Sequence, residues 1–231
     1  MSTNIIQDVL WNVPLFKELT REEIGGAITE IAKIKQYATN SYVFMQGESL
    51  ERVHFIHKGK VKIYKTDING KEQIVSILKS EDMFPHAGFF RKGNYPAHAE
   101  IIESATLVEI PILAFEQLLL QYPSLSIKLF RVMGDIIVDL QKRLEEQVLH
   151  NTEEQIIMLL IRLSKTHGKQ CTDKNMILTT RFTNQELANM IGSSRETVSR
   201  TINKLKREGL VKGTKQGYLL LDMDCLQHYD C

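Results

Sequence analysis

The chain has 231 residues, of which 43% are hydrophobic and 25% charged, with a net charge of only +1, and this composition excludes a disordered or low-complexity chain. No apolar run approaches the roughly 18 residues of a membrane span, and the first residues lack the basic segment of a signal peptide. Three cysteines, at positions 171, 225 and 231, are too few and too clustered to staple a secreted fold, so we expect a cytoplasmic protein with no membrane partner.

Residues 5–35 are predicted to be helical, because apolar side chains from Val9 to Phe16 recur at short intervals. Thr20 is followed three residues later by Glu23, a capping box that predicts a further helix start. We therefore expect an N-terminal helical segment ahead of the first strand.

From Gln36 the hydrophobic period changes to two, which is typical of β-strands. Six short segments rich in β-branched and aromatic residues follow, at residues 42–44, 53–56, 61–64, 74–78, 99–101 and 106–110. Turn signals stand between them at Gln46-Gly47, Lys58-Gly59 and Asn69-Gly70. The Asn-Gly pair predicts a hairpin with a type I′ turn, in which two residues have positive φ. Short antiparallel strands at this spacing predict a small barrel or jelly roll.

A long helix is predicted over residues 125–149, after Pro123. Its apolar residues are spaced 3, 4, 3 and 4 apart, the a/d pattern of a coiled coil: Phe130, Met133, Ile137, Leu140 and Leu144. The chain's own barrel or a partner helix can cover this stripe, and the strict alternation favours a symmetric coiled-coil dimer.

The residues after this helix indicate a domain boundary near residue 150. Asn151 with Glu154 can cap a new helix from Glu153 to His167, which Gly168 ends. Residues 1–150 have a net charge of −2, whereas the window 181–215 alone carries eight basic residues against three acidic ones. Such a local excess is typical of a module that binds a polyanion.

A helix-turn-helix motif lies within the basic window. Thr183 opens a capping box that starts a short helix, and Gly192 supplies the turn. Ser193 with Glu196 predicts a second capping box, which opens a helix over residues 195–208. Residues 209–221 predict a β-hairpin wing.

The second helix has one narrow apolar face, formed by Val198, Ile202 and Leu205, and an opposite polar face, at about 100° per residue. Arginine can bond guanine in bidentate fashion and glutamate accepts from cytosine, so the polar face fits the major groove of DNA. The predicted base-reading residues are Arg195, Glu196, Ser199 and Arg200. The predicted contacts to the DNA backbone are Thr183, Ser194, Asn203, Lys204 and Lys206. A surface helix held by i,i+4 pairs is the alternative.

The run Ser193–Arg200 resembles the recognition helix of the Crp/Fnr family of bacterial transcription regulators. Residues 44–48, 55–61 and 69–72 resemble the family's cyclic-nucleotide-binding-type β-roll, and the helix at 125–149 matches its dimer helix. The resemblance covers nearly the whole chain. It implies an α+β fold with an N-terminal jelly-roll or β-roll, a long dimerisation helix and a C-terminal winged helix-turn-helix.

The resemblance also implies a role for each part of the chain. Residues 1–124 form an effector-sensing domain, residues 125–150 a dimerisation helix and hinge, and residues 151–231 the DNA-binding domain. The implied partners are a second copy of the chain, a palindromic operator in double-stranded DNA, a small-molecule or redox effector, and RNA polymerase if the protein is an activator. Ser199 resembles the Fnr-type pattern for TTGAT-type half-sites, but Arg195 can bind an additional guanine, which favours TGTGA.

The expected effector pocket departs from the pattern of family members that bind cyclic AMP. Those members hold ribose and phosphate with a Gly-Glu pair and an Arg-Ser pair, where this chain has Pro85-His86 and Pro96-Ala97. Proline has no N–H to donate, and neither Pro96 nor Ala97 can neutralise a buried phosphate, so we expect another effector. The residues expected to line the pocket are His86, Gly88, Tyr95, Pro96, Ala97 and His98.

No cofactor or metal is predicted. His86 and His98 flank the pocket and leave haem or metal ligation open, and the three cysteines leave open an iron–sulfur cluster or a thiol switch, although their spacing is not that of a ferredoxin. The sequence contains no nucleophile–base arrangement or phosphate loop, so we expect a protein that is not an enzyme. The alternative function is a cyclic-nucleotide-type regulatory module for a protein partner, without DNA binding.

Overall fold

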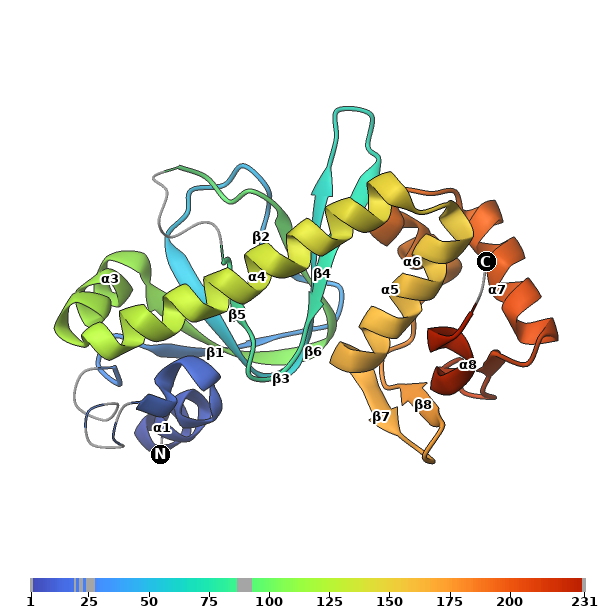
Figure 1. Ribbon diagram of the computed structural model, residues 1–231. Coiled ribbons are helices and arrows are strands. Elements are labelled where there is room, and N and C mark those ends of the chain that lie inside the picture. The colour runs from blue at the N-terminus through green and yellow to red at the C-terminus, as the bar shows by residue number, and fades with distance from the viewer. Residues whose placement is uncertain (1, 19, 21–22, 24–27, 87–92, 230–231) are drawn as a thin grey trace. The chain divides into compact units, whose positions relative to one another are not determined.

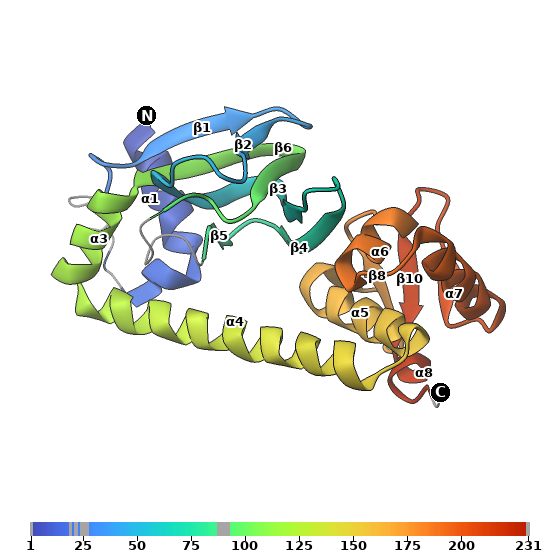
Figure 2. The same ribbon diagram turned by 90° about the horizontal axis from the view of Figure 1, so that it is seen from above.

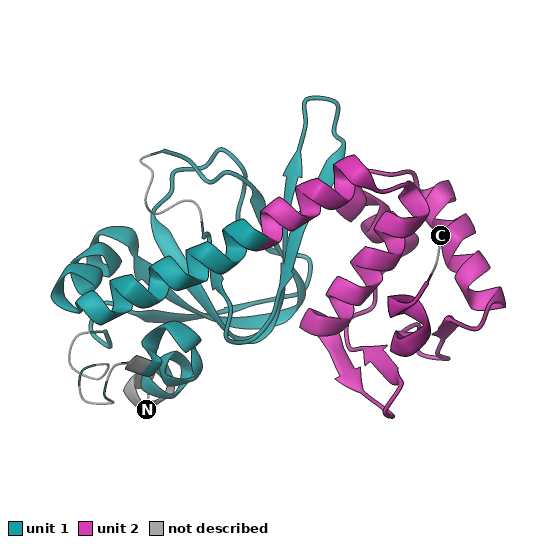
Figure 3. Ribbon diagram, in the orientation of Figure 1, with its two compact units in different colours: residues 1–138 teal, residues 139–231 magenta. Residues whose placement is uncertain are grey.

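The computed structural model describes residues 2–18, 20, 23, 28–86 and 93–229. The chain forms two compact units, residues 1–138 and 139–231, and the division falls inside the long helix α4 (Pro123–Leu149) (Figure 3). Figure 1 labels the elements that make up each unit. Within the described ranges, no helix has the length and hydropathy needed to cross a membrane.

The N-terminal segment is helical over a shorter range than expected. Helix α1 (Ser2–Asn12) is followed by a 3₁₀ helix, η1 (Pro14–Glu18). Thr20 and Glu23 form the predicted capping box, in which Thr20 N donates to the Glu23 carboxylate at 2.7 Å, and residues 24–27 lie outside the described residues. The expectation of helix up to residue 35 is wrong, because strand β1 (Lys33–Tyr37) pairs there with β6.

The strands of unit 1 form one antiparallel sheet of six, with the order β1-β6-β3-β4; β2 pairs with β6 and β5 pairs with β3 (Figure 2). The further bounds are β2 (Tyr42–Phe44), β3 (Arg52–Thr66), β4 (Glu72–Leu78), β5 (Met83–Phe84) and β6 (His98–Pro111). This sheet-rich domain, followed by a long helix and a C-terminal helix-turn-helix, confirms the predicted fold class.

Each of the two longest strands, β3 and β6, joins two segments that were predicted as separate strands. The turn expected at Lys58-Gly59 is wrong, because β3 bulges there and continues along β6. Gly59 has φ +98°, and a Cβ at this position would lie 2.5 Å from the Ser104 carbonyl oxygen. Glycine is therefore needed for the bulge, and the Lys-Gly pair alone did not distinguish a bulge from a turn.

The β3–β4 hairpin forms at Asn69-Gly70, but its turn is not the predicted type I′. Gly70 has φ +79°, whereas Asn69 has no positive φ. Backbone hydrogen bonds of 3.1 Å join Asp67 N to Lys71 O and Gly70 N to Asp67 O, so the loop has three residues. The Asp67 carboxylate also accepts from Asn69 N and Lys71 N, which stabilises this longer loop.

Two apolar clusters hold unit 1 together. The first packs α1, η1 and α3 (Ile112–Gln121) against the sheet and the start of α4, and includes Leu10, Phe16, Phe55, Phe115 and Leu125. The second lies within the roll and includes Phe44, Ile56, Val61, Phe84 and Leu107. Helix α3 was not predicted from the sequence.

Unit 2 is a small α+β domain. Its elements are α5 (Thr152–His167), β7 (Gly168–Gln170), β8 (Asn175–Leu178), α6 (Asn184–Ile191), α7 (Arg195–Arg207), β9 (Val211–Gly213), β10 (Leu219–Asp222) and α8 (Met223–Gln227). Its sheet has the order β7-β8-β10-β9, and the antiparallel pair β9–β10 is the predicted wing.

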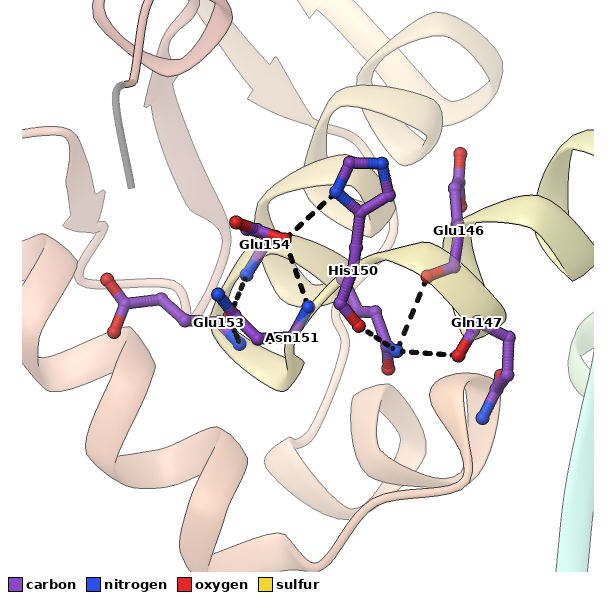
Figure 4. Close-up of polar contacts among 7 residues, drawn as sticks. Glu146, Gln147, His150, Asn151, Glu153 and Glu154 are labelled. Atoms are coloured by element: carbon purple, nitrogen blue, oxygen red, sulfur yellow. Dashed lines mark hydrogen bonds and ion pairs between the residues drawn. The ribbon is translucent and has the colours of Figure 1, made fainter.

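The corner between α4 and α5 is closed by side chains at the start of α5 (Figure 4). Asn151 and Glu154 form the predicted capping box, and Glu154 also meets His150 Nδ1 at 2.9 Å. Gln155 Nε2 donates to three carbonyl oxygens at the end of α4, the shortest contact being 2.8 Å to His150 O. These contacts satisfy carbonyls that a helix end leaves without partners.

Candidate DNA-binding site and effector pocket

Helix α6 and the turn after it form as the sequence predicted. Thr183 Oγ1 accepts from Glu186 N at 3.1 Å, and the Glu186 carboxylate accepts from Thr183 N at 2.8 Å. Gly192 ends the helix in the left-handed conformation, with φ +73°, and its N–H bonds to Ala188 O. A side chain at Gly192 would strain this turn, so glycine is required to bring α7 back against α6.

The second capping box expected at Ser193 and Glu196 is wrong by one residue. The N-cap of α7 is Ser194, whose Oγ accepts from Thr197 N at 3.1 Å. Ser193 N instead bonds to Ala188 O at 3.0 Å, so Ser193 belongs to the end of α6. Position three of α7 is then Thr197, which completes no carboxylate capping box.

Helix α7 has the two faces that its sequence predicts. Val198, Ile202 and Leu205 are buried, and Thr201 is buried beside them. Of the four predicted base-reading residues, Arg195, Glu196 and Arg200 are exposed and Ser199 is half-buried. Within the described part of the chain, none of these four side chains has an intramolecular polar partner, and the three charged side chains are exposed to solvent.

The predicted backbone contacts differ in their surroundings. Asn203 and Lys206 are exposed, and the hydroxyl groups of Thr183 and Ser194 serve as helix caps at exposed positions. Lys204 is different, because its ammonium lies 2.6 Å from Glu153 Oε1 on α5.

This ion pair holds the Lys204 side chain against its own domain. The pair raises the pKa of Lys204 and lowers that of Glu153, and the Tyr229 hydroxyl also donates to Glu153 Oε1, at 2.9 Å. The ammonium of Lys204 is therefore engaged inside unit 2, which the sequence did not indicate.

The residues expected around the effector pocket do not share one environment. Tyr95 and Ala97 are buried, Pro96 is exposed, and Gly88 lies outside the described residues. His98 is half-buried, stacks on Tyr64 with ring centroids 4.8 Å apart, and accepts from Gln46 N at 3.2 Å through Nδ1. His86 is also half-buried, and burial lowers its pKa.

A cavity of about 330 Å³ lies elsewhere in unit 1, and of the five expected pocket residues that the structure describes, only Tyr95 lines it. Its polar wall comes from β1, β3 and β6, through Lys35, Arg52, His54 and Glu109. This cavity is not evident from the sequence, because strand register brings its residues together, as in the direct pairing of His54 with Glu109.

The predicted dimer stripe is mostly exposed on α4. Phe130, Ile137, Leu140 and Leu144 are each 50–66% exposed, an unusual position for large apolar side chains. Met133 is half-buried and packs against the first core cluster.

The histidines and cysteines considered above as ligands of a metal or cofactor form no metal-binding cluster in the described part of the chain. There, no three His, Cys, Asp or Glu side chains are placed so that they could hold a metal ion. Cys171 and Cys225 are exposed free thiols, and Cys231 lies outside the described residues.

Comparison with known proteins assigns both units. Residues 34–122 match the model of the cyclic nucleotide-binding domain, and residues 154–229 match that of the Crp-like helix-turn-helix domain. The chain belongs to the Crp/Fnr family of transcription regulators. As a Crp/Fnr regulator it has a helix-turn-helix DNA-binding domain, which includes α6 and α7, and a cyclic nucleotide-binding-like domain, which includes most of the β-roll.

Curated relatives and solved structures agree with this assignment. The chain is 23% identical to the anaerobic regulatory protein of Bacillus subtilis, over 90% of this chain and 87% of the relative. It is 24% identical to the CRP-like cAMP-activated global transcriptional regulator of Mycobacterium tuberculosis, over 96% and 98%. A CooA mutant from Carboxydothermus hydrogenoformans has the same fold, with a TM-score of 0.72 and 22% identity over 86% and 87% of the two chains. These Crp/Fnr relatives are transcription regulators.

Proposed function

We propose that this protein is a homodimeric regulator in which α7 enters the major groove of a palindromic operator with TGTGA-like half-sites. The observation that supports this most is the polar face of α7. Arg195, Glu196 and Arg200 are exposed and lack partners in the described chain, while the opposite face is buried. A helix with this face can offer bidentate donors to guanine and an acceptor to cytosine.

The proposed readers of bases are Arg195, Glu196, Ser199 and Arg200, which lie in the first two turns of α7, where recognition helices meet base edges. Thr183, Ser194, Asn203 and Lys206 remain the proposed contacts to phosphate. Lys204 is better explained as the residue that ties α7 to α5 through Glu153, since its charge is already neutralised there.

The proposed dimer forms through the α4 stripe. Four apolar side chains at a/d spacing are exposed, and a second copy of the helix would cover them. Twofold symmetry would present two α7 helices to two half-sites roughly 34 Å apart, which explains an inverted repeat. The parts keep the roles expected for them: residues 1–124 sense an effector, residues 125–150 form the dimer helix and hinge, and residues 151–231 bind DNA.

The proposed effector is a small molecule or a redox signal other than cyclic AMP. Cyclic AMP binders have an arginine where this chain has the exposed Pro96 and a serine where it has the buried Ala97. Neither Pro96 nor Ala97 can neutralise a phosphate. Such a regulator acts on DNA in the cytoplasm, and RNA polymerase is a further partner if it activates transcription.

Selection of bound sites from random double-stranded DNA, with and without cell extract, tests the function. The expected product is an inverted repeat of TGTGA and TCACA across a short spacer. A selected motif without G·C pairs in its outer half-site positions would contradict the role of Arg195. If no sequence is enriched in either arm, the protein is instead a regulatory module for a protein partner.

A further inference from the structure

The cavity of about 330 Å³ in unit 1 has a wall of charged and polar groups. His54 and Glu109 are only 2% and 6% exposed. Arg52 and His54 point to the same face of β3 because side chains alternate along a strand, while Val53 and Phe55 point to the apolar cluster under the sheet. The cavity volume lies in the range of sites for small molecules.

The polar groups of this wall satisfy one another only in part. Among the described residues, Arg52 Nη1 and both ring nitrogens of His54 are buried without a hydrogen-bond partner. Glu109 accepts from the Tyr37 hydroxyl at 2.5 Å, but its other neighbours are too distant for hydrogen bonds: His54 Nδ1 at 3.7 Å and the cationic nitrogens of Lys35 and Arg52 at 4.0 Å. Burial lowers the pKa of His54 to about 3, so its ring is neutral at physiological pH.

Leaving such groups unpaired is costly, so a partner of matching chemistry would be bound favourably. Arg52 can only donate and Glu109 can only accept, and their guanidinium and carboxylate face the same space. A ligand with an anion and a cation close together satisfies both groups with charge-assisted hydrogen bonds, which are stronger than those of a neutral ligand.

We propose that this cavity binds a free α-amino acid. The ligand carboxylate accepts from Arg52 Nη1 and a His54 N–H, and the ligand ammonium donates to Glu109. The Phe44 and Tyr95 rings, stacked with centroids 3.6 Å apart, line the cavity and give the amino-acid side chain an apolar wall.

The charges of the lining favour this class over simpler ligands. Glu48, Glu51 and Glu109 provide three carboxylates against the two cations of Lys35 and Arg52. A dianion would meet more negative than positive groups, and a metal ion would lack a set of three suitably placed ligands among the described residues. A zwitterion with no net charge suits the mixed wall. This inference goes beyond the proposed operator, and its test does not involve DNA.

The test uses the full chain and the twenty L-amino acids. Each is screened at 1 mM for a rise in Tm, and each that raises it is titrated by calorimetry. We expect one or a few to bind with a 1:1 ratio per chain. For each binder, the analogue without the amine and the analogue without the carboxylate should bind at least tenfold more weakly.

Variants then locate the site. Arg52→Gln and Glu109→Gln should each weaken binding at least tenfold. Lys58→Gln, on an exposed position of the same strand, and Glu116→Gln, on an exposed position of α3, should leave it unchanged. If Arg52→Gln or Glu109→Gln prevents folding, Lys35→Gln provides a third variant, because the Lys35 side chain is 57% exposed. This variant should weaken binding more modestly.

Three results would overturn the proposal. The first is that no amino acid binds even at 10 mM, which would leave a cavity that holds water only. The second is that an analogue without the amine binds as well as the amino acid, which would make this a site for anions. Binding that survives both Arg52→Gln and Glu109→Gln would lie elsewhere in the chain.

Discussion

Replacing Arg195 by alanine should separate recognition of a base from the stability of the domain. Arg195 is the first residue of α7, is exposed, and has no intramolecular partner in the described chain, so its loss removes no contact from the fold. It also lies at the positive end of the helix dipole, where a cation is unfavourable by about 0.3–1 kcal/mol. Arg195→Ala should therefore leave the free energy of unfolding unchanged or raise it slightly.

The effect on DNA should be specific to one position. A bidentate arginine–guanine contact contributes about 1–3 kcal/mol of discrimination, which corresponds to roughly 5- to 150-fold in affinity ratio. Affinities for the consensus operator and for its single-base variants, measured by fluorescence anisotropy at fixed salt, should show that the preference for one guanine collapses while the others persist. The control is Arg207→Ala, which removes an exposed arginine at the last residue of the same helix.

Two results would refute this reasoning. If Arg195→Ala lowers affinity equally for every sequence, Arg195 contacts phosphate and reads no base. If it lowers the Tm by several degrees, the side chain supports the fold in a way that its exposure does not show.

Four further predictions concern the α4 stripe, the effector, the contacts to phosphate and the glycine that ends α5. Ile137→Asp with Leu140→Asp should convert the proposed dimer to monomers that lose operator binding. A wild type that sediments as a monomer at micromolar concentration would contradict the proposed α4 contact. Cyclic AMP at about 1 mM should not raise the Tm, whereas a site with Kd near roughly 10 μM would add about 2.7 kcal/mol. Lys206→Ala should lower the affinity for all DNA sequences alike and reduce the slope of log affinity against log salt concentration by about one. Lys204→Ala should leave that slope nearly unchanged, because Glu153 already neutralises Lys204. Equal slopes for both variants would be evidence against this distinction. Gly168→Ala should destabilise the protein by about 1–3 kcal/mol in urea unfolding, because its Cβ would lie 2.0 Å from Ser164 O, and an unchanged midpoint would show that α5 can shift.

Features that depend on neighbouring residues were predictable from the sequence. The capping boxes at Asn151 and Thr183 form as expected, because N-cap and N3 residues meet whenever the helix starts there. The buried face of α7 follows equally from helical geometry. One local prediction was nevertheless wrong. Ser193 N bonds to Ala188 O at the end of α6, so the N-cap of α7 is one residue later than predicted.

Features that depend on distant residues were not predictable in this way. Strand β1 forms because β6 offers it a partner, although its own sequence follows a helical segment. The polar cavity depends on the register that sets His54 opposite Glu109 and on the burial of both. Arg52 and His54 lie on β3 and Glu109 lies on β6, and nothing in these two strand sequences indicates that the three side chains will meet.

The position of the apolar stripe on α4 indicates how effector binding could change the affinity for DNA. Phe130, Met133 and Ile137 belong to unit 1, whereas Leu140 and Leu144 belong to unit 2. Met133 also packs against the first core cluster, so this helix connects that cluster to the proposed dimer contact. A ligand changes affinity for the operator only if it binds two arrangements of the protein unequally. In the proposed dimer, an effector would alter operator affinity by changing how α4 packs on the roll. The same helix forms the contact between the two copies and continues into the DNA-binding unit.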